Sequence, residues 1–357
     1  MSDFFHSFNA VRGIQAGRPC YIAMCPMRII PKIFVFDEDE VPAELRAQRK
    51  LNKSRIPEMA NYLIENRNHY TLSSLTASID GETEFVPIDG QSGVNIGTLK
   101  ISMDAQILLN DGQHRRAAIE EAVNNNIELG HDHISVVFFL DSGLKRSQQM
   151  FADLNKHAVR PSPSLATLYD QREELSNVAR KVMNEVHIFS KLTETEKTSI
   201  SNRSIKLFTL SGIKNATKAL LNKGKNDHIT EDEIQLAIDY WKHVSNQIKD
   251  WELAADRKIN SWELREGYIH AHGVLLHALG ILGNQLINDK ASWKALNELS
   301  NIDWSRGSDN WKGRAVVNGR ITKSINNVKL TKNQIKNLIG IQLTTSEKFI
   351  EKEFKAS

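Results

Sequence analysis

The sequence predicts an α+β protein in which a mixed-sheet N-terminal domain precedes a mainly helical domain. Strand-like and helix-like segments alternate up to about residue 160, whereas nearly every periodic segment beyond that point has helical spacing. A Pro-Ser stretch at 160–164 separates the two halves. A chain of 357 residues also exceeds the usual size of a single domain. We therefore expect one domain at 1–163, a second at 164–300, and a basic C-terminal segment at 301–357 that packs on or extends the helical domain.

Several segments of the N-terminal half have strand character. Residues 20–40 are rich in β-branched and aromatic side chains, but Pro26 and Pro31 interrupt them, which is typical of short strands broken by turns. Three further strands are expected in TLSSLTASI, TLKISM and AQILLN. The run HISVVFFL, at 133–140, is almost continuously apolar, which predicts a strand covered on both faces.

The same half contains three segments with helical spacing. Apolar residues recur at helical intervals between about 44 and 67, and again between 111 and 126. We expect Asp111 to cap the second of these helices. A third helix is expected at about 142–156. The residues that it is expected to bury are Leu144, Phe151 and Leu154.

Three apolar stripes beyond the Pro-Ser stretch predict a helical core. Two of them comprise Leu165, Leu168, Leu175, Val178, Val182 and Val186, and then Ile234, Ala237, Ile238 and Trp241; the third is the almost wholly apolar run from Tyr268 to Leu286. Residues 301–357 then carry eleven Lys or Arg against five Asp or Glu. Three tryptophans lie in or just before this segment: Trp293, Trp304 and Trp311. A basic segment with interleaved aromatic residues is typical of nucleic-acid binding.

The composition excludes several classes of protein. With 40% hydrophobic and 25% charged residues, the chain is ordinary for a globular protein and unlike a disordered one. Its formal net charge is only +3, so any DNA binding must depend on where the charges lie. No leader-type segment opens the sequence, and no apolar run is long enough to span a bilayer. We expect a cytoplasmic protein without a membrane partner.

The two cysteines, Cys20 and Cys25, fit no zinc-binding framework. Either they are small, half-buried strand residues, or they form a redox- or metal-responsive switch. The second interpretation requires a neighbouring cation such as Arg18 or Arg28 to stabilise a thiolate.

The most informative motif is LLNDGQHRRAA, at 108–118, which combines a strand end, a glycine turn and the first turn of a helix. The open backbone N–H groups and the positive end of a helix dipole favour a phosphate at such a place. Gly112 would let the backbone approach that phosphate. The side chains expected to bind it are Gln113, His114, Arg115 and Arg116.

A purely structural interpretation of the motif also exists. Asp-Gly after a strand is a common turn, and arginines on a helix usually face solvent. A basic pair in a first helical turn opposes the helix dipole, however, so a structural helix would sooner carry acids there. That conflict favours a functional role for Arg115 and Arg116.

DGQHR followed by RAA resembles the signature of the DGQHR family, which is related to ParB nucleases, ParB-type CTPases and sulfiredoxin. Four other segments are similar to stretches of the DndB family of DNA phosphorothioation proteins, which carry this signature: AQRKLNKSRIPEMANYLIEN, FADLNKHAVRPSPS, SNRSIKLFTLSG and NIDWSRGSDNWKGRA. The resemblance covers nearly the whole chain. It implies a ParB-like N-terminal domain, and a DNA-binding negative regulator of the phosphorothioation gene cluster.

Two departures from related families limit what the resemblance implies. Sulfiredoxins carry a reactive cysteine between the glycine and the histidine, where this chain has Gln113, so repair of sulfinic acid is not expected. ParB-type CTPases place a basic pair after a glycine-acid dipeptide and hold the triphosphate with arginines. This chain has Gln113 at the corresponding position, so we expect no obligatory cofactor but leave CTP or ATP binding open.

Further basic clusters could contact successive DNA phosphates, or could simply lie on solvated helix faces. The segment RAQRKLNKSR contributes Arg46, Arg49, Lys50, Lys53 and Arg55. A second cluster comprises Lys156, His157 and Arg160, which the ParB resemblance would place near the DGQHR turn, and a third comprises Arg203 and Lys206. The histidines of IHAHGVLLH, at 270, 272 and 277, lack the four-residue spacing of a helical metal site, so no metal is expected.

Three hypotheses follow from these observations. In the first, the protein is a non-enzymatic repressor that grips double-stranded DNA through the DGQHR turn and the basic helices, as a homodimer. In the second, the same turn holds CTP or ATP in a ParB-like switch enzyme, with Asp111 as the one carboxylate of the motif available for catalysis. In the third, the protein is an adaptor for the sulfur-modification machinery. The sequence contains no P-loop, dinucleotide-binding or hydrolase motif that would favour other enzymes.

Overall fold

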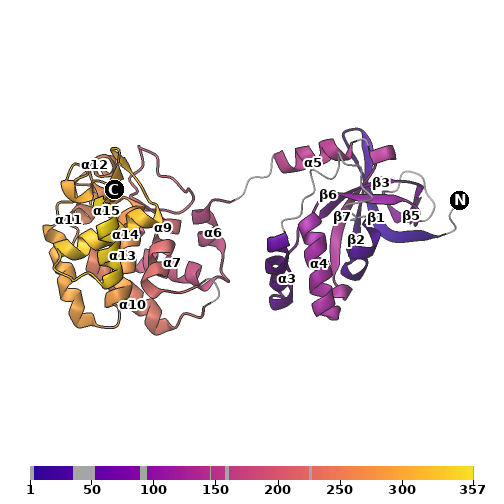
Figure 1. Cartoon of the computed structure of the whole chain (residues 1–357). Helices are drawn as coiled ribbons and strands as arrows, with labels where there is room; N and C mark the ends of the chain where they lie inside the picture. The colour runs from indigo at the N-terminus through magenta and orange to yellow at the C-terminus, as the bar shows by residue number, and fades with distance from the viewer. Residues whose placement is uncertain are drawn as a thin grey trace. The chain divides into compact units, whose positions relative to one another are not determined.

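The computed structural model describes residues 4–34, 53–88, 95–144, 146–156, 161–224 and 227–356. The chain divides into two compact units, Met1–Val159 and Arg160–Ser357. The first is built on a mixed sheet and the second is mainly helical, which confirms the predicted α+β class (Figure 1). Residues 301–357 belong to the second unit.

The sheet of the first unit has seven strands in the order β4-β5-β1-β2-β7-β3-β6. Their bounds are β1 Phe5–Gln15, β2 Arg18–Pro26, β3 Leu75–Asp80, β4 Thr83–Pro87, β5 Ile96–Ser102, β6 Gln106–Asp111 and β7 His133–Leu140. All neighbouring strands pair antiparallel except β3 and β7, which are parallel. The sheet is therefore mixed, as expected.

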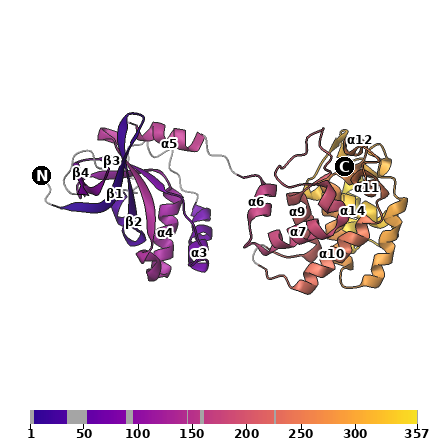
Figure 2. The same ribbon diagram turned by 180° about the vertical axis from the view of Figure 1, so that it is seen from behind.

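Helices cover one face of this sheet. They are α1 Ile30–Ile33, α3 Ile56–Glu65 and α4 Gln113–Asn125. α3 and α4 lie side by side, and their apolar residues, among them Leu63 and Ile119, join one buried cluster with the inward side chains of the strands (Figures 1 and 2). On another part of the sheet, α5 (Ser147–Lys156) packs against β6, where the hydroxyl of Ser147 donates to Asn110 Oδ1 at 2.6 Å.

Several local expectations for this unit were wrong. Residues 27–33 form a 3-10 turn and the short helix α1 rather than strands, because Pro26 ends β2 and Pro31 occupies the first turn of α1. β7 is not covered on both faces, since its side chains alternate between buried and half-buried. In α5, Leu154 is exposed rather than buried.

The second unit is a bundle around a large apolar core. Its helices are α6 Pro163–Tyr169, α7 Glu174–Glu185, α8 His187–Leu192, α9 Leu210–Leu221, α10 Glu231–Ser245, α11 Lys249–Ala255, α12 Ser261–Gly267, α13 Gly273–Leu286, α14 Ile325–Leu338 and α15 Thr345–Ala356. Two short strand pairs, β8 Thr193–Glu194 with β9 Phe208–Thr209 and β10 Val316–Val317 with β11 Arg320–Ile321, complete it.

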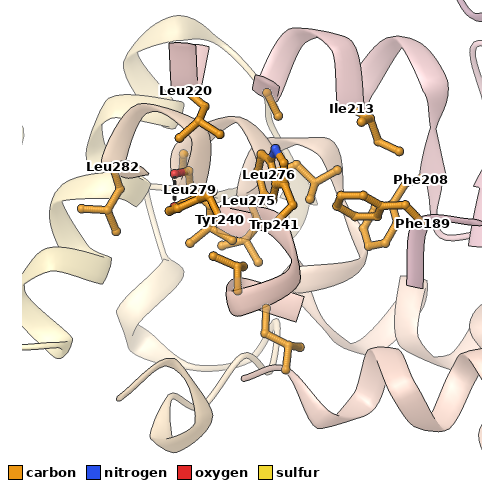
Figure 3. Close-up of a cluster of buried hydrophobic side chains, with 14 of the residues drawn as sticks. Phe189, Phe208, Ile213, Leu220, Tyr240, Trp241, Leu275, Leu276, Leu279 and Leu282 are labelled. Carbon is orange, nitrogen blue, oxygen red and sulfur yellow. Dashed lines mark hydrogen bonds between the residues drawn. The ribbon is translucent and has the colours of Figure 1, made fainter. Parts of the chain in front are cut away.

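The apolar α13 lies at the centre of that core, as its sequence suggests. Figure 3 shows Leu275, Leu276 and Leu279 of α13 among the rings of Tyr240 and Trp241. α13 approaches α9 so closely that a Cβ atom on Gly280 would lie 2.2 Å from the carbonyl oxygen of Ala216. Only glycine allows this contact between the two backbones.

The C-terminal segment 301–357 is an integral part of the bundle rather than a separate tail. The predicted aromatic residues are buried: Trp293, Trp304 and Trp311. Arg314 is also buried, and it donates to both carboxylate oxygens of Glu351 at 2.8 and 2.6 Å. Stacking of bases on these tryptophans is therefore ruled out in this structure.

Candidate functional site

The DGQHR turn connects the edge strand β6 to α4. Gly112 occupies the cap position of α4 with φ +106°, a conformation that L side chains rarely adopt. A Cβ atom there would lie 2.3 Å from Cδ2 of the buried Leu75. The prediction that Asp111 caps the helix was wrong: no side chain caps α4, and the Asp111 carboxylate instead accepts from Arg115.

Internal contacts hold the Arg115 side chain at the turn. Its Nη2 atom donates to Asp111 Oδ2 at 2.6 Å and to the carbonyl oxygen of Ser74 at 3.2 Å, and its Nη1 donates to Ser73 Oγ at 2.7 Å. Its Nε atom is buried and has no hydrogen-bond acceptor among the described residues. Arg115 is therefore fixed in place, with a little under a fifth of its side chain exposed.

Arg116 points into the protein. Its Nη1 donates to Glu120 Oε2 and its Nη2 to the carbonyl oxygen of Pro31, each at 2.8 Å. Only 9% of the side chain is exposed. Gln113 is likewise buried and donates to the carbonyl oxygen of Leu109. Phosphate binding by these residues stays a prediction. The described turn does not present the expected pair of free guanidinium groups, because Arg116 connects α4 to α1 through its hydrogen bond to Pro31.

A second helix begins beside the turn. α3 starts at Ile56, directly after Lys53–Arg55, and packs along α4. Burial lowers the pKa of His114, in the first turn of α4, and the positive charges of Arg55 and Arg115 lower it further. That coupling places Arg55 close to His114, so the two helices begin at the same end of the unit.

Lys53 and Arg55 are solvent-accessible cations at the end of the unit where α3 and α4 begin. Both are exposed, and neither makes an ion pair within the described ranges. No side chain caps α3 or α4, and no acidic residue lies in the first turn of α4. We call this cluster, comprising Lys53, Arg55, Gly112, His114 and Arg115, the helix-start site.

The other residues predicted to contact DNA are in part outside the described ranges. Arg46, Arg49, Lys50, His157 and Arg160 lie outside the described residues, and Lys156 ends α5 with an exposed side chain. In the second unit, Arg203 is exposed, whereas Lys206 donates to the carbonyl oxygen of Lys191 at 2.8 Å. The sequence did not indicate Ser73 and Ser74, which hold Arg115 from more than forty residues away, because no local pattern connects them to the motif.

The cysteines do not form a pair. Cys20 and Cys25 lie five positions apart on β2, so their side chains point to opposite faces of the sheet. Burial raises the pKa of the Cys25 thiol to about 12, which keeps it protonated at neutral pH. An intramolecular disulfide switch between the two is therefore excluded in this fold.

The three histidines at 270, 272 and 277 have separate surroundings. His270 is buried, with Nε2 3.0 Å from Asp250 Oδ2, and His272 Nε2 donates to the carbonyl oxygen of Arg265 at 2.8 Å. Among the described residues, no three His, Cys, Asp or Glu side chains are placed to hold a metal ion. None of the helices in the described part of the chain is both long and apolar enough to cross a bilayer.

Comparison with known proteins gives one clear result. No curated protein and no solved structure matches the chain. A family described as DndB, DNA-sulfur modification-associated, matches residues 8–342, which is nearly the whole length and includes both units. The chain belongs to the DndB family of proteins associated with the sulfur modification of DNA.

Proposed function

We propose that this protein is a DNA-binding regulator that represses a bacterial gene cluster for DNA phosphorothioate modification, and that the helix-start site contacts the phosphate backbone. Membership of the DndB family supports a role in the modification system. The observation that carries the DNA contact is the common starting point of α3 and α4, with the exposed Arg55 and Lys53 beside it.

The start of α4 favours an anion, because it contributes open N–H groups and the positive end of its dipole, and both effects act within the first turn. α3 contributes chiefly the cations of the 3-10 turn that precedes it, since its own first turn contains Pro57 and Glu58. His114 is neutral at pH 7 because its pKa is lowered, so the mobile positive charge comes from Lys53 and Arg55. A phosphate at this place would meet the open N–H groups of α4 and the cations Lys53 and Arg55.

Arg115 contributes through its fixed position. With Ser73 and Ser74 holding Nη1 and Nη2, its guanidinium lies against the turn instead of sampling solvent. Its charge is partly neutralised by Asp111. In the proposed complex a phosphate oxygen must compete with this carboxylate for Arg115 Nη2. Arg115 therefore contributes less to phosphate binding than Arg55, which has no carboxylate to displace among the described residues.

The test is a fluorescence polarisation titration with duplex DNA from upstream of the protein's own gene cluster and with an unrelated duplex. We expect Arg55→Ala to weaken binding to both duplexes and to lower the slope of log K against log salt by about 0.9, as for the loss of one phosphate contact. Arg67→Ala is the matched control, because it removes the same charge near the other end of α3.

Equal effects of the two substitutions would contradict the assignment of the site. Absence of binding to any duplex by the wild-type chain would contradict the regulator itself. A footprint on the upstream region would in addition show whether the contact is sequence-specific, since phosphate contacts position a protein without reading bases.

A nucleotide-binding switch is the second candidate. The positive φ of Gly112 lets the backbone approach a phosphate, and the arrangement of donors would suit the triphosphate of CTP or ATP as well as DNA. A thermal-shift measurement with each nucleotide separates the two functions. Stabilisation by one triphosphate that is lost in Arg115→Ala would favour the switch.

A further inference from the structure

The hairpin of β1 and β2 extends past the strands on either side of it. The ladder of β1 with β5 ends at Val11, and the ladder of β2 with β7 ends at Cys20. The pairing of β1 with β2 continues beyond both of these residues, as far as Gln15 and Arg18. Residues 14–19 therefore form a two-stranded ribbon, which we call the hairpin tip. At about 3.4 Å per residue it projects by roughly 10 Å.

The core of the first unit ends before the hairpin tip. Tyr21 is the last buried residue of β2 on this side, and its ring lies 5.4 Å from that of Phe85. Beyond it, Ile14 is 81% exposed, and its cross-strand partner Pro19 is exposed as well. A Cβ atom on Gly17, at the turn, would meet no atom within 4 Å. The hairpin tip therefore lies open to solvent.

The turn fixes the shape of this ribbon. Ala16 and Gly17 both have left-handed backbones, with φ +50° and +72°. Two such residues form the tight turn whose twist matches that of the flanking strands. Alanine adopts this conformation less readily than glycine, and strain of this kind persists most often at places that bind a partner. The ribbon is thus narrow and formed before any partner arrives.

The hairpin carries positive charge and no acid. Residues 5–26 include Arg12 and Arg18 but neither Asp nor Glu. The guanidinium of Arg12 lies 5.1 Å over the ring of Phe85, whereas Arg18 is exposed and makes no ion pair with another described residue. The first acid after β7, Asp141, is buried, and its carboxylate accepts a backbone N–H group. Arg18 is therefore available to an anionic partner.

The combination of these features fits duplex DNA. Exposed apolar residues that occur singly are common and indicate no partner by themselves. Here the pair Ile14–Pro19 lies at the end of a projecting ribbon, next to Gln15 and Arg18. Proteins that bind the minor groove insert side chains such as Ile or Pro between base pairs and contact the groove with Arg or Gln. A stable protein partner would instead need an apolar surface far wider than one such pair.

We propose that the hairpin tip enters the minor groove of duplex DNA, where Ile14, supported by Pro19, inserts between two base pairs and bends the duplex. Gln15 and Arg18 point to the other side of the ribbon, where they contact the groove edge and the adjacent phosphates. This inference rests on the proposed DNA-binding function. It adds a readout of DNA shape, because pyrimidine–purine steps kink more easily than others, whereas phosphate contacts carry no sequence information.

Energy transfer between fluorophores at the two ends of the upstream duplex tests the inference with the full chain. We expect the wild-type protein to bend the duplex by roughly 20–90°. Ile14→Ala should lose most of the bend and weaken binding by on the order of tenfold, since the inserted side chain holds the kink. Ile14→Lys adds a charge for the phosphates, so it should lose the bend without loss of affinity at low salt. Arg18→Ala should weaken binding and leave the bend in place.

Ile22→Ala is the matched control. Ile22 is also an exposed isoleucine of this hairpin, at 49%, but it lies within the sheet and is paired with Val11 on one side and Val137 on the other. Its substitution should change neither the bend nor the affinity. Because Ile14 is not buried, its variants should fold like the wild type, which circular dichroism checks.

Two results would overturn this inference and leave the proposed function standing. One is a wild-type protein that binds the duplex without bending it, and the other is a pair of Ile14 variants that bend it as the wild type does. Failure of the wild type to bind any duplex would overturn both, and the polarisation titration detects that outcome separately from the bend.

Discussion

Basic residues are used in opposite ways by the helix-start site and by the C-terminal segment. At the helix-start site, Arg55 is exposed without an ion pair among the described residues, and Arg115 shares a partly exposed carboxylate. In the C-terminal segment, Lys332 and Lys336 are buried against a single buried Glu347, and Arg314 is buried against Glu351. The number of basic residues in a segment therefore does not measure its charge available to DNA. What decides it is whether acidic side chains lie within reach in the fold.

The energetic roles differ accordingly. A buried ion pair stabilises little compared with apolar packing, but the removal of one partner leaves an uncompensated charge in the interior. An exposed cation contributes almost nothing to stability and remains free to bind a phosphate. Substitutions in the two clusters should therefore separate stability from DNA binding.

The largest effect is expected for Glu347→Gln. It would leave the ammonium groups of Lys332 and Lys336 buried without their counter-charge, at a cost of about 3–5 kcal/mol. Glu353→Gln, on the exposed side of α15, should cost close to nothing. Chemical denaturation of the two variants measures the difference in the free energy of unfolding. Similar midpoints would mean that the ion pairs of Glu347 with Lys332 and Lys336 do not stabilise the packing of α15.

A related prediction concerns acid. Burial alone would raise the pKa of Glu347, but hydrogen bonds from Lys332, Lys336 and Gln285 outweigh it and hold the pKa well below its usual range. The stabilisation is therefore complete above the ordinary pKa of glutamate, near 4.5, and is lost as the pH falls below it. Thermal melting between pH 6 and 3 should show a steeper loss for wild type than for Glu347→Gln.

Gly112→Ala is expected to have the next largest effect, on the first unit. Positive φ and the contact with Leu75 together should cost about 2–4 kcal/mol. Gly17→Ala provides the comparison, since Gly17 also has positive φ but open space around its Cβ position, so only about 1 kcal/mol is expected. Equal losses in denaturant titrations would show that the close approach to Leu75 is unimportant.

The smallest effect is expected for Asp111→Asn. Removing the carboxylate charge weakens the hold on one N–H of Arg115 Nη2, while the other still donates to the carbonyl oxygen of Ser74. Binding to any duplex should strengthen by about two- to fivefold, which corresponds to a partly exposed ion pair of roughly 0.5–1 kcal/mol. Glu120→Gln changes the net charge equally but frees only the buried Arg116, so it should not strengthen binding. Polarisation titrations at low salt compare the two, and a gain in both would indicate a general charge effect.

The sequence alone predicted the elements whose patterns are local. The run at 133–140 forms β7 and the periodic segment after the DGQHR turn forms α4, because alternation and helical spacing depend on neighbours in the chain. β1 was missed, although Phe8 and Ala10 alternate with polar residues and the Ala-Gly pair at 16–17 is a two-residue hairpin turn.

The sequence could not predict which residues form hydrogen bonds and ion pairs with these arginines. Arg115 and Arg116 lie in the first turn of a helix, as predicted, but their contacts include Ser73 and the carbonyl oxygen of Pro31, which are distant in the chain. The buried pairing of Arg314 with Glu351 also spans 37 residues. Pairings of this kind depend on tertiary packing, so the charge pattern of the C-terminal segment overestimated the number of cations that the fold leaves exposed, as the buried Arg314, Lys332 and Lys336 show.

The position of β7 has a consequence for how the first unit is made. It is the last strand of this sheet in chain order, yet it lies inside the sheet, between the β4-β5-β1-β2 group and the β3-β6 pair. Until residues 133–140 leave the ribosome, the nascent chain contains the strands of both groups but lacks the strand that connects the two groups into one sheet. Folding of this unit must therefore await near-complete synthesis of its own sequence, and the joining strand must find partners more than a hundred residues earlier on β2.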